Sequence, residues 1–309
     1  MKLKRLIATI ITLCLTAFLI IKAGQFLDPA YMDGCYDQIK AFHELPENSV
    51  DAIIYGTSHA WKGVDSRVIN DKYGVSCYNY ACNWQCLNTS ELFIKDSLYT
   101  QSPKYIILDT YNQSVLRDTN MVGEVYYTRY LPNTQARKDY LEECFVGDKG
   151  RYFSYYVPLV ALHDSWENIT SENFIPLDDG VNTYISDRGY APSDVVFETS
   201  IGDYTQFEQL ELKESAEPVY EELATFCREN DIQLILITIP ATKEPEYNYF
   251  DAFTRFADSH ENVTYLNLYA MDEEHAINPL TDFQDDDHLN SSGAYKVGDY
   301  LGKYLTTNF

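Results

Sequence analysis

The chain has 309 residues, of which 45% are hydrophobic and 15% aromatic, enough to bury a sizeable core and too many for a disordered chain. Its 23 basic and 47 acidic residues give a formal charge of −24 at pH 7. A surface this acidic repels polynucleotides and anionic lipid headgroups, so the composition argues against a nucleic-acid partner. Neutral or zwitterionic envelope glycans remain compatible partners.

The first 23 residues are typical of a signal peptide or a signal anchor. A basic start is followed by sixteen uncharged residues, Leu6 to Ile21, and then by Lys22. Roughly 20 residues span a bilayer, and the stems of flanking Lys and Arg side chains extend a shorter run. No small-x-small cleavage site is evident, so we favour an uncleaved anchor, residues 1–23, with the rest of the chain outside the membrane. A buried core helix, the alternative, suits neither the terminal position nor the basic flank.

A tether over residues 24–45 precedes the predicted globular part. Apolar, β-favouring runs predict strands at 50–55, 75–80, 105–109, 232–239 and 263–268. Helical spacing predicts helices at 61–72, 90–99, 208–230 (interrupted by Pro218), 249–259 and 292–305. Continuous apolar strands that alternate with helices indicate a parallel sheet covered on both faces. We therefore expect a three-layer α/β fold of flavodoxin-like type, with strand order 2-1-3-4-5, over residues 46–309.

Residues 113–204 interrupt the alternation of strands and helices. The segment is rich in tyrosine, has an apolar-aromatic run at 152–160, and ends in a polar, turn-rich stretch. We interpret it as an insertion between the third and fourth strands, helical in its first half and irregular later. It could cover the site or bind the partner.

The seven cysteines do not form a metal-binding pattern. Cys14 lies in the anchor and six follow it, an even number that permits disulfides in an exported protein and leaves their pairing open. Cys82-x-x-x-Cys86 could form half a zinc site, but no second pair with nearby histidines follows. We expect no metal and no cofactor.

A candidate nucleophile follows the first predicted strand, in Gly56-Thr57-Ser58-His59. Ligands of open parallel sheets bind at the carboxyl ends of strands, and backbone N–H groups at the start of a helix favour developing negative charge. Ser58 occupies such a position. The alternative is a tight turn in which Thr57 or Ser58 only caps the helix.

A candidate base lies near the other terminus, in Asp285-Asp286-Asp287-His288-Leu289-Asn290. A serine hydroxyl is a weak nucleophile and needs a base. His288 precedes the last helix, and Asp285, three residues earlier, is close enough in a turn to orient its imidazole. Alternatively the three aspartates form a solvated turn beside an uninvolved His288, or Asp285 and Asp287 hold a cation.

The two blocks together resemble the SGNH/GDSL hydrolase superfamily, most closely its membrane-anchored, DltD-like branch, which is associated with acyl modification of cell-envelope polymers. The resemblance covers the chain from about residue 48 to its end. It implies that Ser58 is the nucleophile, that His288 is the general base and then the general acid, and that Asp285 orients the imidazole. These residues would form an acyl-enzyme through a tetrahedral intermediate.

The family also has a glycine after the second strand and an asparagine after the third, which donate hydrogen bonds to the oxyanion. In this chain Ala81 stands in place of the glycine, and Asn112 follows the third strand. Asn79 is a further candidate donor. His59 is interpreted as a supporting residue of the same oxyanion and substrate-binding group.

The resemblance implies a serine esterase or O-acyltransferase outside the cytoplasm, acting on acetyl or D-alanyl esters of a surface polysaccharide or teichoic-acid-like polymer. A multispanning membrane O-acyltransferase is an implied partner. Hydrolysis and transfer stay open, because water and a sugar hydroxyl attack the same acyl-enzyme. The alternative is a catalytically weak polymer-binding or assembly factor on the same fold.

Overall fold

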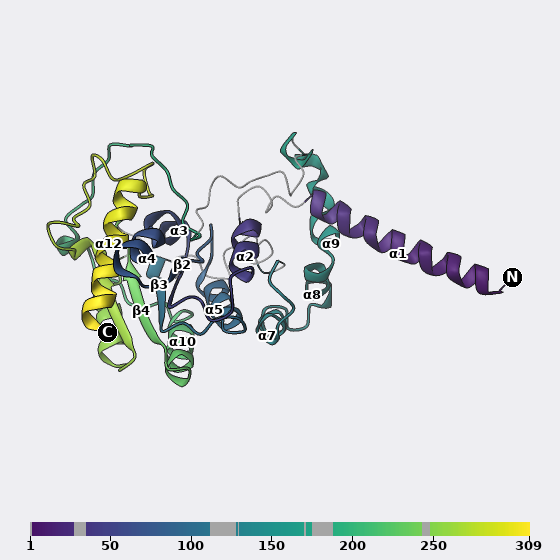
Figure 1. Cartoon of the computed structure of the whole chain (residues 1–309), viewed down its shortest axis with the longest axis horizontal. Helices are drawn as coiled ribbons and strands as arrows, with labels where there is room; N and C mark the ends of the chain where they lie inside the picture. The colour runs from purple at the N-terminus through teal and green to yellow at the C-terminus, as the bar shows by residue number, and fades with distance from the viewer. Residues whose placement is uncertain are drawn as a thin grey trace. The chain divides into compact units, whose positions relative to one another are not determined.

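The computed structural model describes residues 2–27, 35–111, 128, 130–169, 171–174, 188–242 and 248–309. The chain forms two compact units, one of residues 1–36 with 125–182 and one of residues 37–124 with 183–309. Each unit has its own elements, and Figure 1 labels many of them. Asn112 lies outside the described residues, and its role as a donor to the oxyanion stays a prediction.

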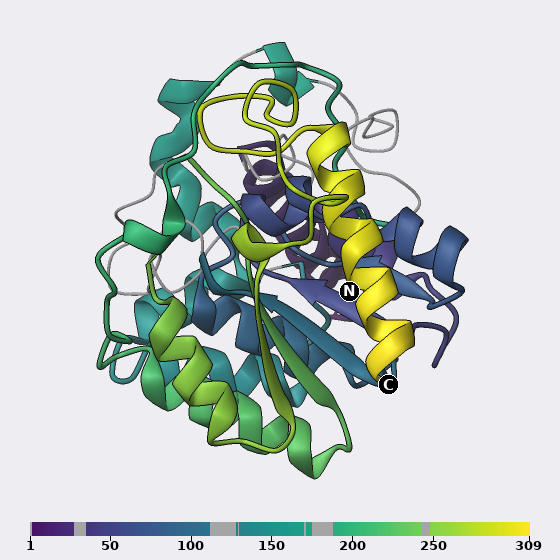
Figure 2. The same ribbon diagram turned by 90° about the vertical axis from the view of Figure 1, so that its left-hand side faces the viewer.

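The second unit is built on a five-stranded parallel sheet in the order β2-β1-β3-β4-β5 (Figure 2). The strands are β1 (Ala52–Tyr55), β2 (Cys77–Asn79), β3 (Tyr105–Asp109), β4 (Gln233–Thr238) and β5 (Val263–Asn267). β1 pairs with both β2 and β3, so it is an interior strand and its carboxyl end has a neighbouring strand on each side. The predicted α/β fold class and strand order are confirmed.

One face of the sheet packs on α3 (Ser58–Gly63), α4 (Ser66–Tyr73) and α12 (Ser291–Asn308). Side chains alternate between the two faces of a strand, and Ala52 and Ile54 of β1 both belong to the core cluster on this face. Val297 and Leu301 of α12 are fully buried in the same cluster. This layer therefore joins the first strand and the last helix of the unit.

The other face packs on α5 (Leu87–Ser97), α10 (Glu217–Glu229) and α11 (Phe250–Asp258). Tyr55 points to this side, and its hydroxyl donates to Oγ of Ser97 at 2.6 Å. The rings of Tyr220 in α10 and Phe253 in α11 meet at 5.2 Å. Both faces are thus covered by helices, which explains why the strands are apolar throughout.

Two predicted helices have different bounds in the structure. The expected helix at 61–72 is two helices, because Val64 is extended (φ −127°, ψ 108°) and the side chain of Asp65 accepts the N–H of Arg67 to cap α4. The expected helix at 208–230 begins only at Glu217. Pro218 lies in its first turn, where the missing N–H costs no intrahelical bond.

Residues 188–203 of the predicted insertion run extended along the second unit. Asn79 N–H donates to Arg188 C=O at 2.9 Å, Ala191 N–H to Trp61 C=O at 3.1 Å, and Ser291 N–H to Ser193 C=O at 2.7 Å. The unit also contains η6 (Tyr204–Gln206), η8 (Leu268–Ala270) and most of α2 (Cys35–His43), because the unit begins at residue 37. Cys77, Cys82 and Cys227 of this unit are buried free thiols.

The first unit contains α1 (Lys2–Phe26), α7 (Gln135–Cys144), α8 (Lys149–Tyr156), α9 (Pro158–Leu162), η4 (His163–Asn168) and η5 (Ser171–Phe174). The described first half of the predicted insertion is therefore helical. At the end of α1 the ring of Phe26 meets that of Phe174 at 5.1 Å, and Asn173 Nδ2 donates to the Phe26 carbonyl at 2.8 Å. The carboxyl end of α1 is thus fixed to the helical insertion.

Candidate active site

The turn between β1 and α3 requires a glycine at position 56. Gly56 has φ +144°, and a Cβ there would lie 2.6 Å from Cβ of Asp109. Its N–H donates to Oε1 of Gln85 at 2.8 Å, and its carbonyl accepts the N–H of Cys82 at 3.2 Å. The loop after β2 therefore holds this turn in place from the neighbouring strand.

Thr57 and Ser58 divide the two roles that the sequence left open. Thr57 is the N-cap of α3, and its Oγ1 accepts the N–H of His59 at 3.3 Å. Ser58 is the first helical residue and is partly exposed. Because Thr57 performs the capping, the Ser58 hydroxyl is left for other contacts.

The loop before α12 is tightly organised by its own hydrogen bonds. Phe283 and Leu289 form an antiparallel bridge, and Gln284 N–H donates to His288 C=O at 2.9 Å. Asp285 Oδ1 accepts the backbone N–H of Asp287 at 2.9 Å and that of His288 at 2.7 Å. The aspartates thus form a structured turn around one of their own carboxylates.

Ser58, His288 and Asp285 meet across 230 residues of sequence. Ser58 Oγ lies 2.8 Å from His288 Nε2, and His288 Nδ1 lies 3.0 Å from both carboxylate oxygens of Asp285. Burial would raise the pKa of Asp285, but hydrogen bonds and charge from His288 outweigh it and lower this pKa below its usual range. Asp285 therefore stays ionised, with an imidazole between it and the serine, as in a Ser-His-Asp arrangement.

Two further predicted donors to the oxyanion, Asn79 and Ala81, make hydrogen bonds within the protein. Asn79 is buried, and its Nδ2 donates to the carbonyls of Ala60 at 2.8 Å and Val64 at 3.0 Å. Its Oδ1 accepts the N–H of Ala81 at 3.2 Å. Asn79 therefore fixes the backbone that follows Ser58, and the N–H of Ala81 is already used.

His59 also has different contacts from those expected of an oxyanion or substrate-binding residue. Its side chain is 2% exposed, its Nε2 lies 3.2 Å from Oδ1 of Asp287, and its Nδ1 lies 3.4 Å from Oγ1 of Thr57. Burial lowers the pKa of His59, although the hydrogen bond with Asp287 opposes this shift. The ring is thus neutral and held within the protein, and its part in the oxyanion and substrate-binding group stays a prediction.

Asp109 is a buried carboxyl group beside the turn that carries Ser58. The sequence predicts it only as the last residue of a strand. It accepts hydrogen bonds from Thr57 Oγ1 at 3.3 Å and from Tyr111 N–H at 3.2 Å. Burial raises its pKa to about 7, against these hydrogen bonds. A charged residue that ends an apolar strand was the available signal for it.

The loop that binds Gly56 also exposes an aromatic residue, Trp84. Trp84 has φ +58°, which is uncommon for a bulky residue, and its side chain is 59% exposed. It lies between Cys82 and Gln85, which both contact Gly56. Trp84 could not be predicted as a site residue, since exposure and backbone conformation leave no pattern in the sequence.

Among the described residues, two groups have the ligand types and spacing to hold a cation. One is His59, Asp287 and His288, and the other is Asp272 and Glu274 with His275. In the first group His59 and Asp287 already contact each other, and His288 Nε2 contacts Ser58. We interpret this group as a hydrogen-bonding network and assign no metal to it.

Comparison with known proteins finds similarity among solved structures alone. No protein-family model and no curated protein matches the chain. A protein provisionally named as a lipolytic protein of the G-D-S-L family, from Desulfitobacterium hafniense, is 9% identical with a TM-score of 0.43, over 82% of this chain and 98% of that one. A provisionally named acylhydrolase from Bacteroides fragilis is 9% identical with a TM-score of 0.41, over 87% and 93%. Similarity of this degree does not place the chain in either protein's family.

Proposed function

We propose that the chain is a membrane-anchored serine esterase or O-acyltransferase whose catalytic residues are Ser58, His288 and Asp285. The observation that supports this proposal is the continuous chain of contacts from Ser58 Oγ through His288 to the Asp285 carboxylate, at 2.8 and 3.0 Å. A partly exposed serine hydroxyl, an imidazole at hydrogen-bond distance and a carboxylate behind it are the parts that acyl transfer needs.

In this mechanism Ser58 Oγ attacks the carbonyl carbon of an ester while His288 Nε2 takes the hydroxyl proton. The tetrahedral intermediate then expels the alcohol, to which His288 returns the proton, and the acyl group remains on Ser58. Water or an acceptor hydroxyl, deprotonated by His288, attacks the acyl-enzyme and restores the serine. Asp285 holds the imidazole and stabilises its positive charge at both stages.

The proposed substrate is an acetyl or D-alanyl ester of a cell-envelope polysaccharide or teichoic-acid-like polymer. The motif resemblance to the DltD-like branch supports this choice, and so does Trp84, because an exposed aromatic face packs well on a sugar ring. A multispanning membrane O-acyltransferase is the proposed partner on the same resemblance.

A helix long and apolar enough to cross a membrane is present at the N-terminus. α1 has 25 residues, a mean hydropathy of 2.4 over its most apolar 18 residues, and none of that stretch is buried. We propose that α1 is an uncleaved anchor with the rest of the chain outside the membrane. The absence of an evident small-x-small cleavage site after the apolar run supports retention. Mass analysis of the membrane-bound protein should find the first 23 residues attached.

Labelling with a fluorophosphonate tests the catalytic proposal. The parent protein should react, and Ser58→Ala should not. Ser102→Ala is a matched control, because Ser102 is an exposed serine whose hydroxyl donates to Asn48 Oδ1 and does not contact the three residues. Incubation of a labelled acyl donor with a glycan acceptor, followed by mass analysis, separates transfer from hydrolysis.

The second candidate function is a catalytically weak polymer-binding or assembly factor on the same fold. The observation that favours it is the engagement of the Ala81 N–H and the Asn79 amide in hydrogen bonds within the protein. Loss of one oxyanion donor costs roughly 10²–10³-fold in turnover. A folded parent that the fluorophosphonate leaves unlabelled would favour this function over the enzyme.

A further inference from the structure

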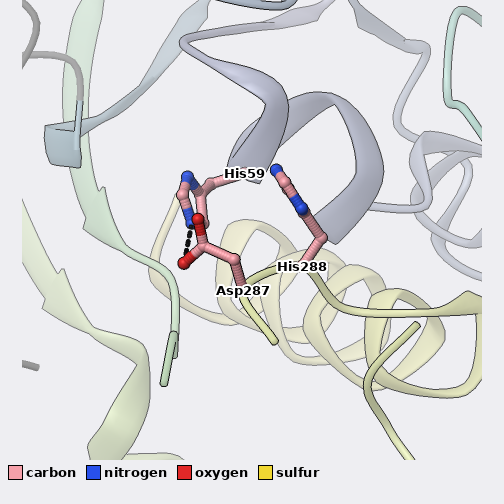
Figure 3. Close-up of side chains that lie close together, drawn as sticks. All are labelled: His59, Asp287 and His288. Carbon is pink, nitrogen blue, oxygen red and sulfur yellow. Dashed lines mark ion pairs between the residues drawn. The ribbon is translucent and has the colours of Figure 1, made fainter. Parts of the chain in front are cut away.

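A second histidine–aspartate pair lies directly beside the proposed catalytic residues (Figure 3). His59 follows Ser58 in the sequence, and Asp287 precedes His288. His59 Nε2 lies 3.2 Å from Asp287 Oδ1, and the two side chains are 2% and 9% exposed. In Figure 3 the carboxylate of Asp287 faces the His59 ring, and the His288 ring stands alongside. The centroids of the two imidazoles are 5.0 Å apart and their planes 28° from parallel.

The two pairs connect the same two short segments of chain. Ser58–His288 and His59–Asp287 both join the start of α3 to the loop before α12. The first contact must change during acyl transfer, because an acylated Ser58 has no hydroxyl hydrogen to donate. The second contact involves no reacting atom, so it persists when the first is lost.

Asp287 is also coupled to the orientation of the base. Its N–H donates to Oδ1 of Asp285 at 2.9 Å, the same oxygen that lies 3.0 Å from His288 Nδ1. A shift of Asp287 would therefore move the carboxylate that holds His288. Through its contact with Asp287, His59 in α3 therefore influences the position of the His288 imidazole.

Asp287 further places a second negative charge near His288. A carboxylate oxygen of Asp287 lies within 4.8 Å of a ring nitrogen of His288. An opposite charge at this distance favours the charged form of a group. The imidazolium that forms in each acyl-transfer step would thus be stabilised by Asp287 as well as by Asp285.

This effect requires that His59 remain neutral, since a charged His59 would cancel the charge of Asp287. Burial and the neighbouring His288 lower the pKa of His59, while Asp287 and Asp285 raise it, and the net shift is downward. Two residues after β3, the Tyr111 ring packs on His59 at 3.6 Å between centroids. Asp109 in the same strand hydrogen-bonds Thr57 and the Tyr111 N–H.

We propose that His59 and Asp287 form a positioning pair. The pair holds the turn after β1, which carries Ser58, against the loop before α12, which carries His288, and it keeps a second carboxylate beside His288. The inference rests on the proposed function of Ser58, His288 and Asp285. His59 and Asp287 touch no reacting atom, and they act on the reaction through Ser58 and His288.

Three substitutions separate the two parts of this role. Asp287→Asn keeps an acceptor for His59 and removes the charge. His59→Leu removes the contact with Asp287, and His59→Gln can restore a donor to Asp287. The control is Asp286→Asn, the same change one residue away, at an exposed position. Each full-length variant is compared for fluorophosphonate labelling and for kcat and KM on p-nitrophenyl acetate across pH, with thermal unfolding as the check on folding.

We expect Asp287→Asn and His59→Leu to lower kcat about 10–100-fold with little change in KM, and His59→Gln to recover most of the loss. In Asp287→Asn the acidic limb of kcat/KM should move to lower pH, because the His288 imidazolium loses a stabilising charge. The proposal is overturned if Asp287→Asn and His59→Leu match Asp286→Asn, or if Asp287→Asn loses activity with no shift of the acidic limb. If Asp287→Asn does not fold, the comparison of His59→Leu with His59→Gln decides. A parent that is not labelled defeats the proposed function instead.

Discussion

Substitution of Asp285 by Asn provides a quantitative test of the proposed site. Asp285 accepts four contacts, two from His288 Nδ1 at 3.0 Å and one each from the N–H groups of Asp287 and His288 at 2.9 and 2.7 Å. An Asn oxygen can still accept the backbone N–H groups, so the turn should survive. The amide nitrogen would donate to Nδ1, which moves the ring proton to Nε2. His288 could then no longer accept the proton of Ser58.

The expected magnitude follows from this change of tautomer. In Ser-His-Asp triads the same substitution lowers kcat about 10⁴-fold. The Asp285 side chain is 41% exposed, so water replaces part of the lost carboxylate, and we expect a loss of about 10²–10⁴-fold. The rate of fluorophosphonate labelling and kcat for p-nitrophenyl acetate measure it, with urea unfolding as a control for stability. Activity within threefold of the parent would refute the assignment of Asp285 as the residue that orients His288.

Three further predictions concern the turn, the buried carboxyl and the exposed aromatic. Gly56→Ala should destabilise the fold by about 2–5 kcal/mol in urea unfolding, because its Cβ would meet Asp109 at 2.6 Å and its φ is +144°; an unchanged midpoint would contradict this. The raised pKa of Asp109, about 7, means that its contribution to stability is full below its ordinary value of 3.8 and is lost as pH rises through about 7. That loss is roughly 4 kcal/mol in all, of which about 2–3 kcal/mol falls between pH 5 and pH 8, so the parent should unfold more easily at pH 8 and Asp109→Asn should show a smaller difference; equal pH dependence would count against it. Trp84→Ala should raise KM for an acylated polymer about 3–30-fold and leave p-nitrophenyl acetate unaffected, whereas equal effects on both substrates would show that Trp84 does not contact the polymer.

The sheet was predictable because its strands carry their own signal. Buried parallel strands are apolar on both faces, so runs such as 105–109 and 232–239 stand out from the helices between them. Helix bounds were less predictable. Residues 61–72 have one helical pattern, yet Asp65 caps a second helix inside it, and α10 begins at Glu217, nine residues after the pattern started. Capping competes with periodicity, and periodicity alone does not show which prevails.

The sequence by itself determined the residue types of the proposed chemistry and their order along the chain. Gly56-Thr57-Ser58 after a strand and Asp285-x-x-His288 before a helix are local patterns, and local backbone geometry limits what such short segments can do. It also determined the acidic charge and the apolar N-terminal helix, which depend on composition. These features need no knowledge of distant contacts.

Only the tertiary structure decided which side chains meet. It placed Ser58 against His288, brought Asp287 to His59, and engaged Asn79 and Ala81 with each other. Asp285, Asp286 and Asp287 are the same residue type, and only their contacts in the folded chain distinguish their roles. Hydrogen bonds form between groups within about 3 Å, and for residues 230 positions apart that distance is set by the packing of α3 and α12 on one face of the sheet.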